Sequence, residues 1–295
     1  MESGSAVVNG YLSTLGEAKI PLLDKGFLFG SSLFETLLVL NGRIVLWNEH
    51  MQRLAYGAQK ALISMPSESR ILNDARRVIQ HNIRSSEQTS HKMQLRIMLT
   101  GGTSAALWED LPTELEPNLM MFCRNIPGIS PETYRQGIRL QSQPELRSLA
   151  TIDIKSSNYL LQMKALAEAR KNGFDDAIFV GSDGDFSEST TASFLWINSN
   201  SNLCTCPTFQ KCLSGTTLLA LRNALAKCGQ QILEKALPAS SMNHTLGAAI
   251  LSSTRGVVPV RSIDAYNFDV DSLQSEFSKW NEILLAEQLE NSLEI

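Results

Sequence analysis

A lysine near the middle of the chain, Lys155, is a candidate for covalent chemistry. It closes the segment Thr-Ile-Asp-Ile-Lys, in which two isoleucines alternate with Asp153 and Lys155, and this alternation predicts a strand with one face open to a cavity. A single lysine is usually a solvated surface residue. A lysine that forms a Schiff base needs a rigid element and partial desolvation, which lowers the pKa of its amine. A strand end provides the rigid element.

A carboxylate, Glu188, is the second candidate. It lies in Phe-Ser-Glu-Ser-Thr-Thr-Ala-Ser-Phe-Leu-Trp-Ile, between an Asp183-Gly184 turn and an apolar strand that starts at Phe194. An ordinary loop carboxylate is one interpretation. The other is a partner for a protonated ring nitrogen, because a carboxylate at that place keeps the ring charged and the charge makes the ring an electron sink.

Two clusters of hydroxyl side chains could bind a phosphate. Leu213-Ser-Gly-Thr-Thr-Leu leads into a helix that begins near Thr216, and the glycine exposes backbone N–H groups at the helix N-terminus while the hydroxyls add donors. An ordinary capped helix explains the same residues. Ser252-Ser253-Thr254, before Val257-Val-Pro-Val260, is equally ambiguous by itself.

One arginine, Arg53, also has two interpretations. It can pair with Glu49, four residues earlier, on a solvated helix face. Alternatively, its guanidinium can clamp a phosphate. His50, one turn away, fits a core or an interface equally well.

The cysteines and the common nucleotide motifs indicate neither a metal site nor a dinucleotide site. Cys204-Thr-Cys206 with Cys212 lacks a fourth zinc ligand nearby, so no metal is predicted. The five cysteines are an odd number spread through a large chain, which predicts reduced thiols. The sequence contains no Gly-x-Gly-x-x-Gly, P-loop or His-Glu-x-x-His pattern.

The elements that must position these residues alternate between strands and helices. Short apolar runs next to turn residues predict strands at 34–40, 43–46, 94–99, 119–123, 177–180 and 194–197. Apolar spacings of three and four predict a helix from Asn48, and further helices at 161–172, 216–228 and 271–289. Asn41-Gly42 predicts a hairpin between the first two strands.

Two prolines and a glycine interrupt the pattern after residue 123, which predicts a domain boundary there. We expect an α/β (α+β) fold with a small N-terminal α+β domain (1–123), a linker (124–133) and a larger C-terminal domain of mixed strands and helices (134–295).

Bulk composition favours small-molecule chemistry. A chain of 295 residues with 43% hydrophobic content can bury two cores. Its net charge of −4 makes nucleic acid and anionic membranes poor partners. No apolar run approaches the ~20 residues that span a bilayer, and the first nine residues do not resemble a secretory signal. We therefore expect no membrane partner and a cytoplasmic location.

In their order along the chain, these segments resemble the class IV aminotransferases of fold type IV. That family contains branched-chain aminotransferases, D-amino acid aminotransferases and 4-amino-4-deoxychorismate lyases. The matching segments are Asp24-Lys-Gly26-Phe-Leu-Phe-Gly30-Ser-Ser-Leu-Phe34-Glu35-Thr36, His50-Met-Gln-Arg53-Leu, Ile154-Lys155-Ser-Ser-Asn158-Tyr, Ser187-Glu188-Ser, Ser214-Gly215-Thr-Thr217 and Ser253-Thr254 with Pro259-Val260. Several motifs in a fixed order, over roughly residues 9 to 262, are far more specific than any single one.

The resemblance implies a pyridoxal 5'-phosphate (PLP) enzyme. Lys155 would form the internal aldimine and then move the proton between the substrate α-carbon and C4′ of the cofactor. Glu188 would pair with the ring nitrogen, and Tyr159 would approach the ring's phenolic oxygen. The phosphate would be held by Arg53, Gly215, Thr216, Thr217, Ser253 and Thr254. The resemblance also implies a homodimer, in which the neighbouring N-terminal domain completes the active site.

Two positions depart from the family pattern. Gly101-Gly102 stands where an Arg-Gly pair is common, so the carboxylate-binding arginine of D-amino acid aminotransferases is missing. Phe34 replaces a tyrosine typical of the same group, which brings this substrate position closer to the branched-chain and lyase members. Arg96, or a residue of the loop 103–111, is then the candidate for binding the substrate carboxylate.

Three functions follow as hypotheses. The first is transamination between an amino acid and a 2-oxo acid through Lys155. The alternative is 4-amino-4-deoxychorismate lyase activity, a β-elimination with the same cofactor and lysine. The third is a cofactor-free binding or scaffold protein, against which the intact Lys155 and Glu188 argue. The sequence leaves the substrate and its enantiomer open.

Overall fold

The computed structural model describes residues 4–85, 92–106, 115–147 and 151–295. The chain divides into two compact units, of which the first comprises Met1–Gly128, Ile154–Asn158 and Asn291–Ile295 and the second Ile129–Asp153 and Tyr159–Glu290. The change of unit at Gly128 falls inside the segment 124–133 of the sequence analysis. Residues 154–158 and 291–295 belong to the first unit because their backbones pair with its strands.

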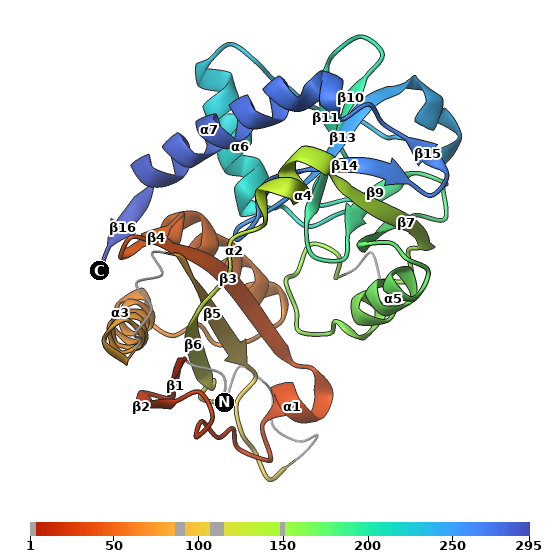
Figure 1. Ribbon diagram of the computed structural model, residues 1–295. Coiled ribbons are helices and arrows are strands. Elements are labelled where there is room, and N and C mark those ends of the chain that lie inside the picture. Colours follow the sequence, from red (N-terminus) through yellow and green to blue (C-terminus); the bar gives the residue numbers. More distant parts are fainter. Residues whose placement is uncertain (1–3, 86–91, 107–114, 148–150) are drawn as a thin grey trace. The chain divides into compact units, whose positions relative to one another are not determined.

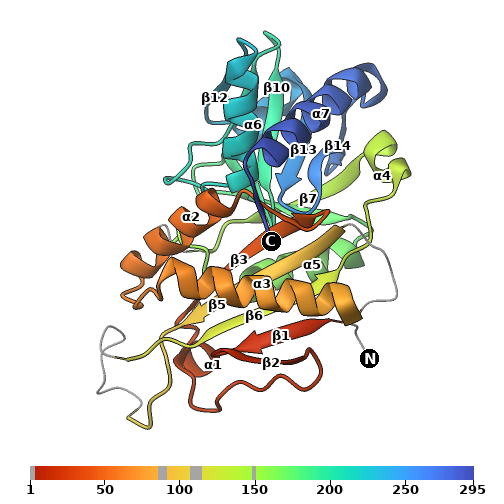
Figure 2. The same cartoon turned by 90° about the vertical axis from the view of Figure 1, so that its left-hand side faces the viewer.

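The first unit is an antiparallel sheet with two helices on one face (Figures 1 and 2). Its strand order is β16-β4-β3-β5-β6-β1-β2. The strands are β1 (Ser5–Val8), β2 (Tyr11–Thr14), β3 (Ser32–Leu40), β4 (Arg43–Val45), β5 (Lys92–Thr100), β6 (Leu119–Asn125) and β16 (Ser292–Glu294), and the helices are α1 (Lys25–Phe29), α2 (Trp47–Lys60) and α3 (Glu68–Ser85).

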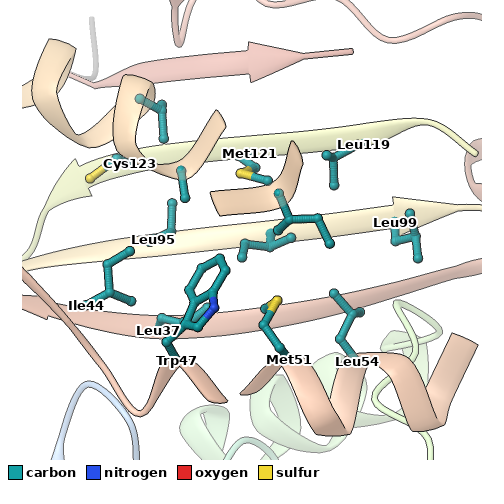
Figure 3. Packing of buried hydrophobic residues seen from close by; sticks show 14 of the residues in the cluster. Leu37, Ile44, Trp47, Met51, Leu54, Leu95, Leu99, Leu119, Met121 and Cys123 are labelled. Atoms are coloured by element: carbon teal, nitrogen blue, oxygen red, sulfur yellow. The ribbon is translucent and has the colours of Figure 1, made fainter. Parts of the chain in front are cut away.

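Side-chain alternation explains why α2 and α3 cover this face of the sheet. Along β5, half-buried and buried residues alternate, as the two-residue period of a strand requires. Figure 3 shows Trp47, Met51 and Leu54 of α2 packed over the buried side chains of β3 and β5. The helix α3, which the sequence analysis did not predict, contributes a further buried stripe of Ile71, Ala75, Val78 and Ile79.

A buried carboxylate fixes the loop before β3. Asp24 caps α1 by accepting a hydrogen bond from the backbone N–H of Phe27 at 2.8 Å. Its other oxygen accepts from Thr100 Oγ1 at 2.5 Å and from Asn118 Nδ2 at 2.6 Å. Because Asp24 is buried and bonded to residues from the ends of β5 and β6, the start of β3 is held against its neighbouring strands.

The second unit is a mixed sheet with helices packed on it (Figure 1). Its strand order is β12-β11-β10-β13-β14-β7-β8-β9, with β15 beside β14. The strands are β7 (Ile138–Pro144), β8 (Asp176–Val180), β9 (Phe186–Ser189), β10 (Ser193–Asn198), β11 (Leu203–Thr205), β12 (Ile232–Glu234), β13 (Thr245–Ser252), β14 (Gly256–Ile263) and β15 (Tyr266–Asn267). The α-helices are α4 (Pro131–Gln136), α5 (Leu160–Lys171), α6 (Thr216–Lys227) and α7 (Gln274–Glu290), and the 3-10 helices are η2 (Ala239–His244) and η3 (Asp271–Leu273).

The parallel pairing of β7 with β8 requires a crossover connection. This connection contains α5, which packs on both strands, and before α5 it includes the segment 154–158 of the first unit. The hydrophobic core of this unit is mostly aliphatic and includes the rings of Phe194 and Trp196, which stack with their centres 5.6 Å apart.

Two expectations about local structure were wrong. Residues 151–154 form turns and a bend rather than a strand, and the backbone of Lys155 then pairs with β3 of the first unit. The cysteines are not all reduced, since Cys206 and Cys212 form a disulfide while Cys123, Cys204 and Cys228 are free. Both cysteines lie in the stretch between β11 and α6, six residues apart.

In the described part of the chain, no helix combines the length and the apolar character needed to cross a membrane.

We predict that Gly30→Ala destabilises the first unit. Gly30 ends α1 in the left-handed region (φ 71°), and a Cβ there would lie 2.0 Å from Asn158 Oδ1. The left-handed conformation and the overlap together should lower the free energy of unfolding by at least ~2 kcal/mol, measured by urea denaturation. Gly42→Ala is the matched control, because Gly42 has φ 74° and no atom within 4 Å of its Cβ position. Equal losses in the two variants would contradict the steric argument.

Candidate active site

Backbone pairing holds Lys155 beside the first residues of β3. The N–H of Phe34 donates to the carbonyl of Lys155 at 3.0 Å, and the N–H of Ser157 donates to the carbonyl of Ser32 at 3.1 Å. Ile154 packs on the core of the first unit. As a result, the Nζ of Lys155 lies 4.6 Å from the centre of the Phe34 ring. The rigid element that this lysine requires is therefore a sheet edge.

The same ring also contacts Arg96. The Cζ of Arg96 lies 3.5 Å from the centre of the Phe34 ring, a cation–π distance. Arg96 stands opposite Thr36 in the β3–β5 register, and its Nη1 donates to Thr36 Oγ1 at 3.1 Å. The structure thus brings together Phe34 and Arg96, the two substrate candidates of the sequence, with Lys155, the candidate for covalent chemistry.

The strand end at Gly101 has no room for a side chain without movement of Ser31. A Cβ at Gly101 would lie 2.6 Å from Ser31 Oγ. An arginine at this position would require Ser31 to shift. The other carboxylate candidate, the loop 103–111, lies outside the described residues from position 107 onward.

Arg53 pairs with Glu35 rather than with Glu49. The Nε of Arg53 donates to Glu35 Oε1 at 2.8 Å, and its Nη2 donates to Oε2 at 2.6 Å. His50 Nδ1 lies 2.6 Å from the same Oε2. Since His50 and Arg53 are three residues apart on α2, they share one helix face, and that face lies over Glu35 of β3.

The Glu35 cluster is buried and nearly electroneutral. Burial alone would raise the pKa of Glu35, but the charge and hydrogen bonds of Arg53 and of His50 outweigh it and hold this pKa well below its usual range. Burial lowers the pKa of His50, and the Glu35 charge opposes this effect only in part. An ionised carboxylate can only accept hydrogen bonds, so the Nδ1 of a neutral His50 must carry the proton.

The sequence contains a signal that Glu35 needs charged or polar partners, besides its place in a family motif. It occupies an inward position of β3, in phase with the core residues Leu33 and Leu37. A carboxylate in phase with a buried apolar face needs charged or polar partners. The His50 and Arg53 pair at helical spacing on the next helix could have been matched to it.

In the second unit, Glu188 lies on the strand β9 rather than in a loop and is buried. Its Oε1 accepts a hydrogen bond from Arg147 Nη1 at 2.6 Å. Arg147 also donates to Glu145 through Nε at 2.9 Å and through a second contact from Nη2, and its guanidinium lies 4.9 Å from the centre of the Phe179 ring. The charge partner of Glu188 is thus an arginine that the sequence analysis did not single out.

Arg147 remains a cation in this cluster. Burial opposes its charge, but the hydrogen bonds and charges of Glu145 and Glu188 raise its pKa above the usual value. A carboxylate has acceptor sites on both oxygens, so the bond from Arg147 to Oε1 is compatible with a second donor. No local sequence pattern distinguishes Arg147, because only the pairing of β8 with β9 and of β7 with β8 brings its partners together.

The hydroxyl residues converge at the N-terminus of α6. Gly215 is the N-cap residue and gives the helix no side-chain cap, and Thr216 and Thr217 of the first turn are buried. Thr217 Oγ1 and Ser253 Oγ are 3.5 Å apart, which joins the two clusters that the sequence kept separate. Thr254 follows Ser253 in a turn between β13 and β14, which Arg255 holds by donating to Ser252 Oγ at 3.1 Å.

These residues fit a phosphate and a pyridine ring in their chemistry. A Cβ at Gly215 would lie 2.3 Å from Ser193 Oγ, so the helix start needs a glycine. Helix N–H groups and hydroxyls are suitable donors for a phosphate, and a carboxylate such as Glu188 suits a protonated ring nitrogen. Tyr159 is the N-cap residue of α5 and is half-buried. Within the described ranges, no group of three or more His, Cys, Asp or Glu side chains could hold a metal ion.

Comparison with known proteins agrees with this chemistry. The chain is 26% identical over 264 residues to a protein named as a branched-chain-amino-acid aminotransferase in Methanocaldococcus jannaschii, with 87% of each chain covered. It is 25% identical over 258 residues to the D-alanine aminotransferase of Bacillus licheniformis, again with 87% of each chain covered.

Solved structures share the fold. A hypothetical aminotransferase from Mycobacterium tuberculosis in its PLP-bound form superposes with a TM-score of 0.84 at 22% identity, over 97% of this chain and 99% of that one. A Legionella pneumophila protein named as a 4-amino-4-deoxychorismate lyase gives a TM-score of 0.78 at 23% identity, over 92% and 96% of the two chains. The family model for amino-transferase class IV matches residues 32–263. The chain therefore belongs to the class IV aminotransferases and is a PLP-dependent enzyme of fold type IV.

Proposed function

We propose that the enzyme transfers an amino group between an amino acid and a 2-oxo acid, with Lys155 as the catalytic lysine. The observation that carries the proposal is the placement of two cations on one ring, the amine of Lys155 and the guanidinium of Arg96 on Phe34. An amino acid presents an amine and a carboxylate a few ångströms apart. In this proposal the guanidinium of Arg96 pairs with the carboxylate, and the substrate amine comes to the place of the Lys155 amine. The relatives named as aminotransferases support the same reaction.

Each candidate residue has a defined task in this proposal. Lys155 would hold the cofactor through its amine and would move the proton at the substrate α-carbon. Glu188 would keep the ring nitrogen protonated, and Tyr159 would orient the phenolic oxygen. The phosphate would be held by Arg53, Gly215, Thr216, Thr217, Ser253 and Thr254. When bound, the cofactor supplies a pyridinium ring that takes up the electron pair released at the substrate carbon.

The half-reaction with an amino donor tests the function. Adding a suitable L- or D-amino acid to the holoenzyme should move the visible absorbance band of the bound cofactor to shorter wavelength, and a 2-oxo acid should restore it. Lys155→Ala is the control, and it should fold normally, judged by circular dichroism, but show no turnover. Absence of a shift with every donor of both enantiomers, together with release of pyruvate and 4-aminobenzoate from 4-amino-4-deoxychorismate, would instead establish the lyase alternative.

Arg96 is the residue that we propose for the substrate carboxylate. Its guanidinium is restrained on both sides, by the Phe34 ring and by the bond to Thr36. It also replaces the missing arginine at Gly101, where a side chain would meet Ser31. A charge-assisted hydrogen bond from a restrained guanidinium gives the carboxylate a defined orientation relative to Lys155.

We predict that Arg96→Gln lowers kcat/KM for amino acid donors by about 10- to 100-fold, as expected from the loss of a charge-assisted hydrogen bond. Primary amines that lack a carboxylate should react at an unchanged rate, however slow, and PLP affinity should stay within about twofold of the wild-type value. The ratio of the two kcat/KM values, for an amino acid and for the matching amine, is the measurement. An unchanged ratio would remove Arg96 from substrate recognition.

We also propose a homodimer, with an apolar surface around α1 as its contact. This α1 patch consists of Ile20, Leu22, Leu23, Phe27, Leu28 and Phe29, all exposed, with Leu22 at 74% and Phe27 at 60%. Contiguous exposed apolar side chains of this size mark association surfaces. The patch belongs to the N-terminal unit, which the family resemblance assigns to subunit contact. The cytoplasmic location stays a prediction.

The dimer is tested by sedimentation. Wild-type protein should sediment as a dimer, and the double variant Leu22→Asp, Phe27→Asp should shift to the monomer mass, because charges on an apolar contact are not compensated. Ile83→Asp, an exposed apolar residue on α3 outside the α1 patch, is the matched control and should remain dimeric. A monomeric wild type, or a double variant that stays dimeric, would refute the proposed contact.

A further inference from the structure

The Glu35 cluster is built more elaborately than an ordinary helix-to-sheet contact requires. Glu35 is fully buried, as is His50, while the Arg53 side chain is 11% exposed. An apolar residue at position 35 would pack against Leu33 and Leu37 without any charge to compensate, and buried ion pairs often give no net stability over such a residue. The placement of a carboxylate here therefore calls for a function.

We propose that Glu35 is a positioning residue for Arg53, and that His50 in turn positions Glu35. The inference rests on the proposed role of Arg53 as a phosphate ligand. The two bonds from Arg53 engage its Nε and Nη2 edge, so they fix both the plane of the guanidinium and the rotamer of its long side chain. A guanidinium has five N–H donors, and the two bonds to Glu35 use two of them.

Preorganisation is the physical benefit of this arrangement. An arginine side chain loses much rotational freedom when it binds a ligand, and a side chain that is already held loses less at that moment. Because Glu35 stays ionised and His50 neutral, the charges of Glu35 and Arg53 cancel, and the cluster of these three residues carries no net charge. Glu35 acts only through Arg53, so its effect must vanish when Arg53 is absent.

The test compares PLP with pyridoxal, which lacks the phosphate. The chain is stripped of cofactor, and dissociation constants for both aldehydes are measured by absorbance titration. Glu35→Gln, which keeps the shape and removes the charge, should weaken PLP binding by roughly 10- to 30-fold while pyridoxal binding stays within about twofold of wild type. A general structural role would weaken both aldehydes equally, which would overturn the inference.

A double variant separates positioning from an independent contact. Adding Glu35→Gln to Arg53→Ala should cause no further loss of PLP affinity, because the two residues act as one unit. Additive losses would contradict the coupling. If Arg53→Ala leaves the ratio of PLP to pyridoxal affinity unchanged, the proposed phosphate role of Arg53 is refuted. If Arg53→Ala lowers this ratio and Glu35→Gln does not, only the positioning role of Glu35 is refuted.

A milder variant covers the case in which Glu35→Gln does not fold. His50→Asn replaces the Nδ1 donor by an amide donor of similar placement, and His50→Ala removes it. His50→Ala should lower the ratio of PLP to pyridoxal affinity several-fold and His50→Asn should restore most of it, at similar thermal unfolding midpoints. Equal ratios in wild type and His50→Ala would count against the chain of positioning from His50 through Glu35 to Arg53.

Discussion

The site depends on two backbone hydrogen bonds that attach a short segment to the edge of β3. The bonds from Phe34 to Lys155 and from Ser157 to Ser32 return residues 154–158 to the first unit, although β7 before them and α5 after them belong to the second. Backbone donors and acceptors at a sheet edge must be satisfied, and this segment satisfies them. The main chain of Lys155, the lysine proposed to be catalytic, is thereby fixed, and only its side chain remains to be placed.

Buried charges in both units follow one rule. Each carboxylate that the family pattern singles out, Glu35 and Glu188, accepts a hydrogen bond at 2.6 Å from an arginine, Arg53 in the first unit and Arg147 in the second. The reason is the high cost of burying a charge without a partner. Each of the two guanidinium groups, of Arg53 and Arg147, is therefore oriented by a buried carboxylate.

Glycines mark the places where backbone and side chains approach too closely for a Cβ. Gly30 lies against Asn158, which follows the lysine segment, and Gly215 lies against Ser193 at the start of α6. Gly101 belongs to the same group, because Ser31 occupies the space that a side chain would need. Arg96, on the strand that leads to Gly101, is the guanidinium nearest to the Phe34 ring in the described contacts.

Much of this protein could be predicted from local sequence patterns. The spacing of apolar residues predicted the bounds of β3, β5, β6, β8 and β10, and of the helices α2, α5, α6 and α7, to within a few residues. The order of the motifs identified the family and the cofactor. These properties are local, because a helix or strand face and a short motif are determined by residues that are neighbours in the chain.

Tertiary structure alone decided which side chains meet. Lys155 lies on a strand edge of the first unit instead of in a strand of its own, Arg53 turns to Glu35 instead of Glu49, and Glu188 pairs with Arg147, 41 residues away. None of these contacts has a sequence spacing that distinguishes it from its alternatives. They arise because a sheet brings distant residues into register, and because a buried charge takes the partner that packing supplies rather than the one nearest in the chain.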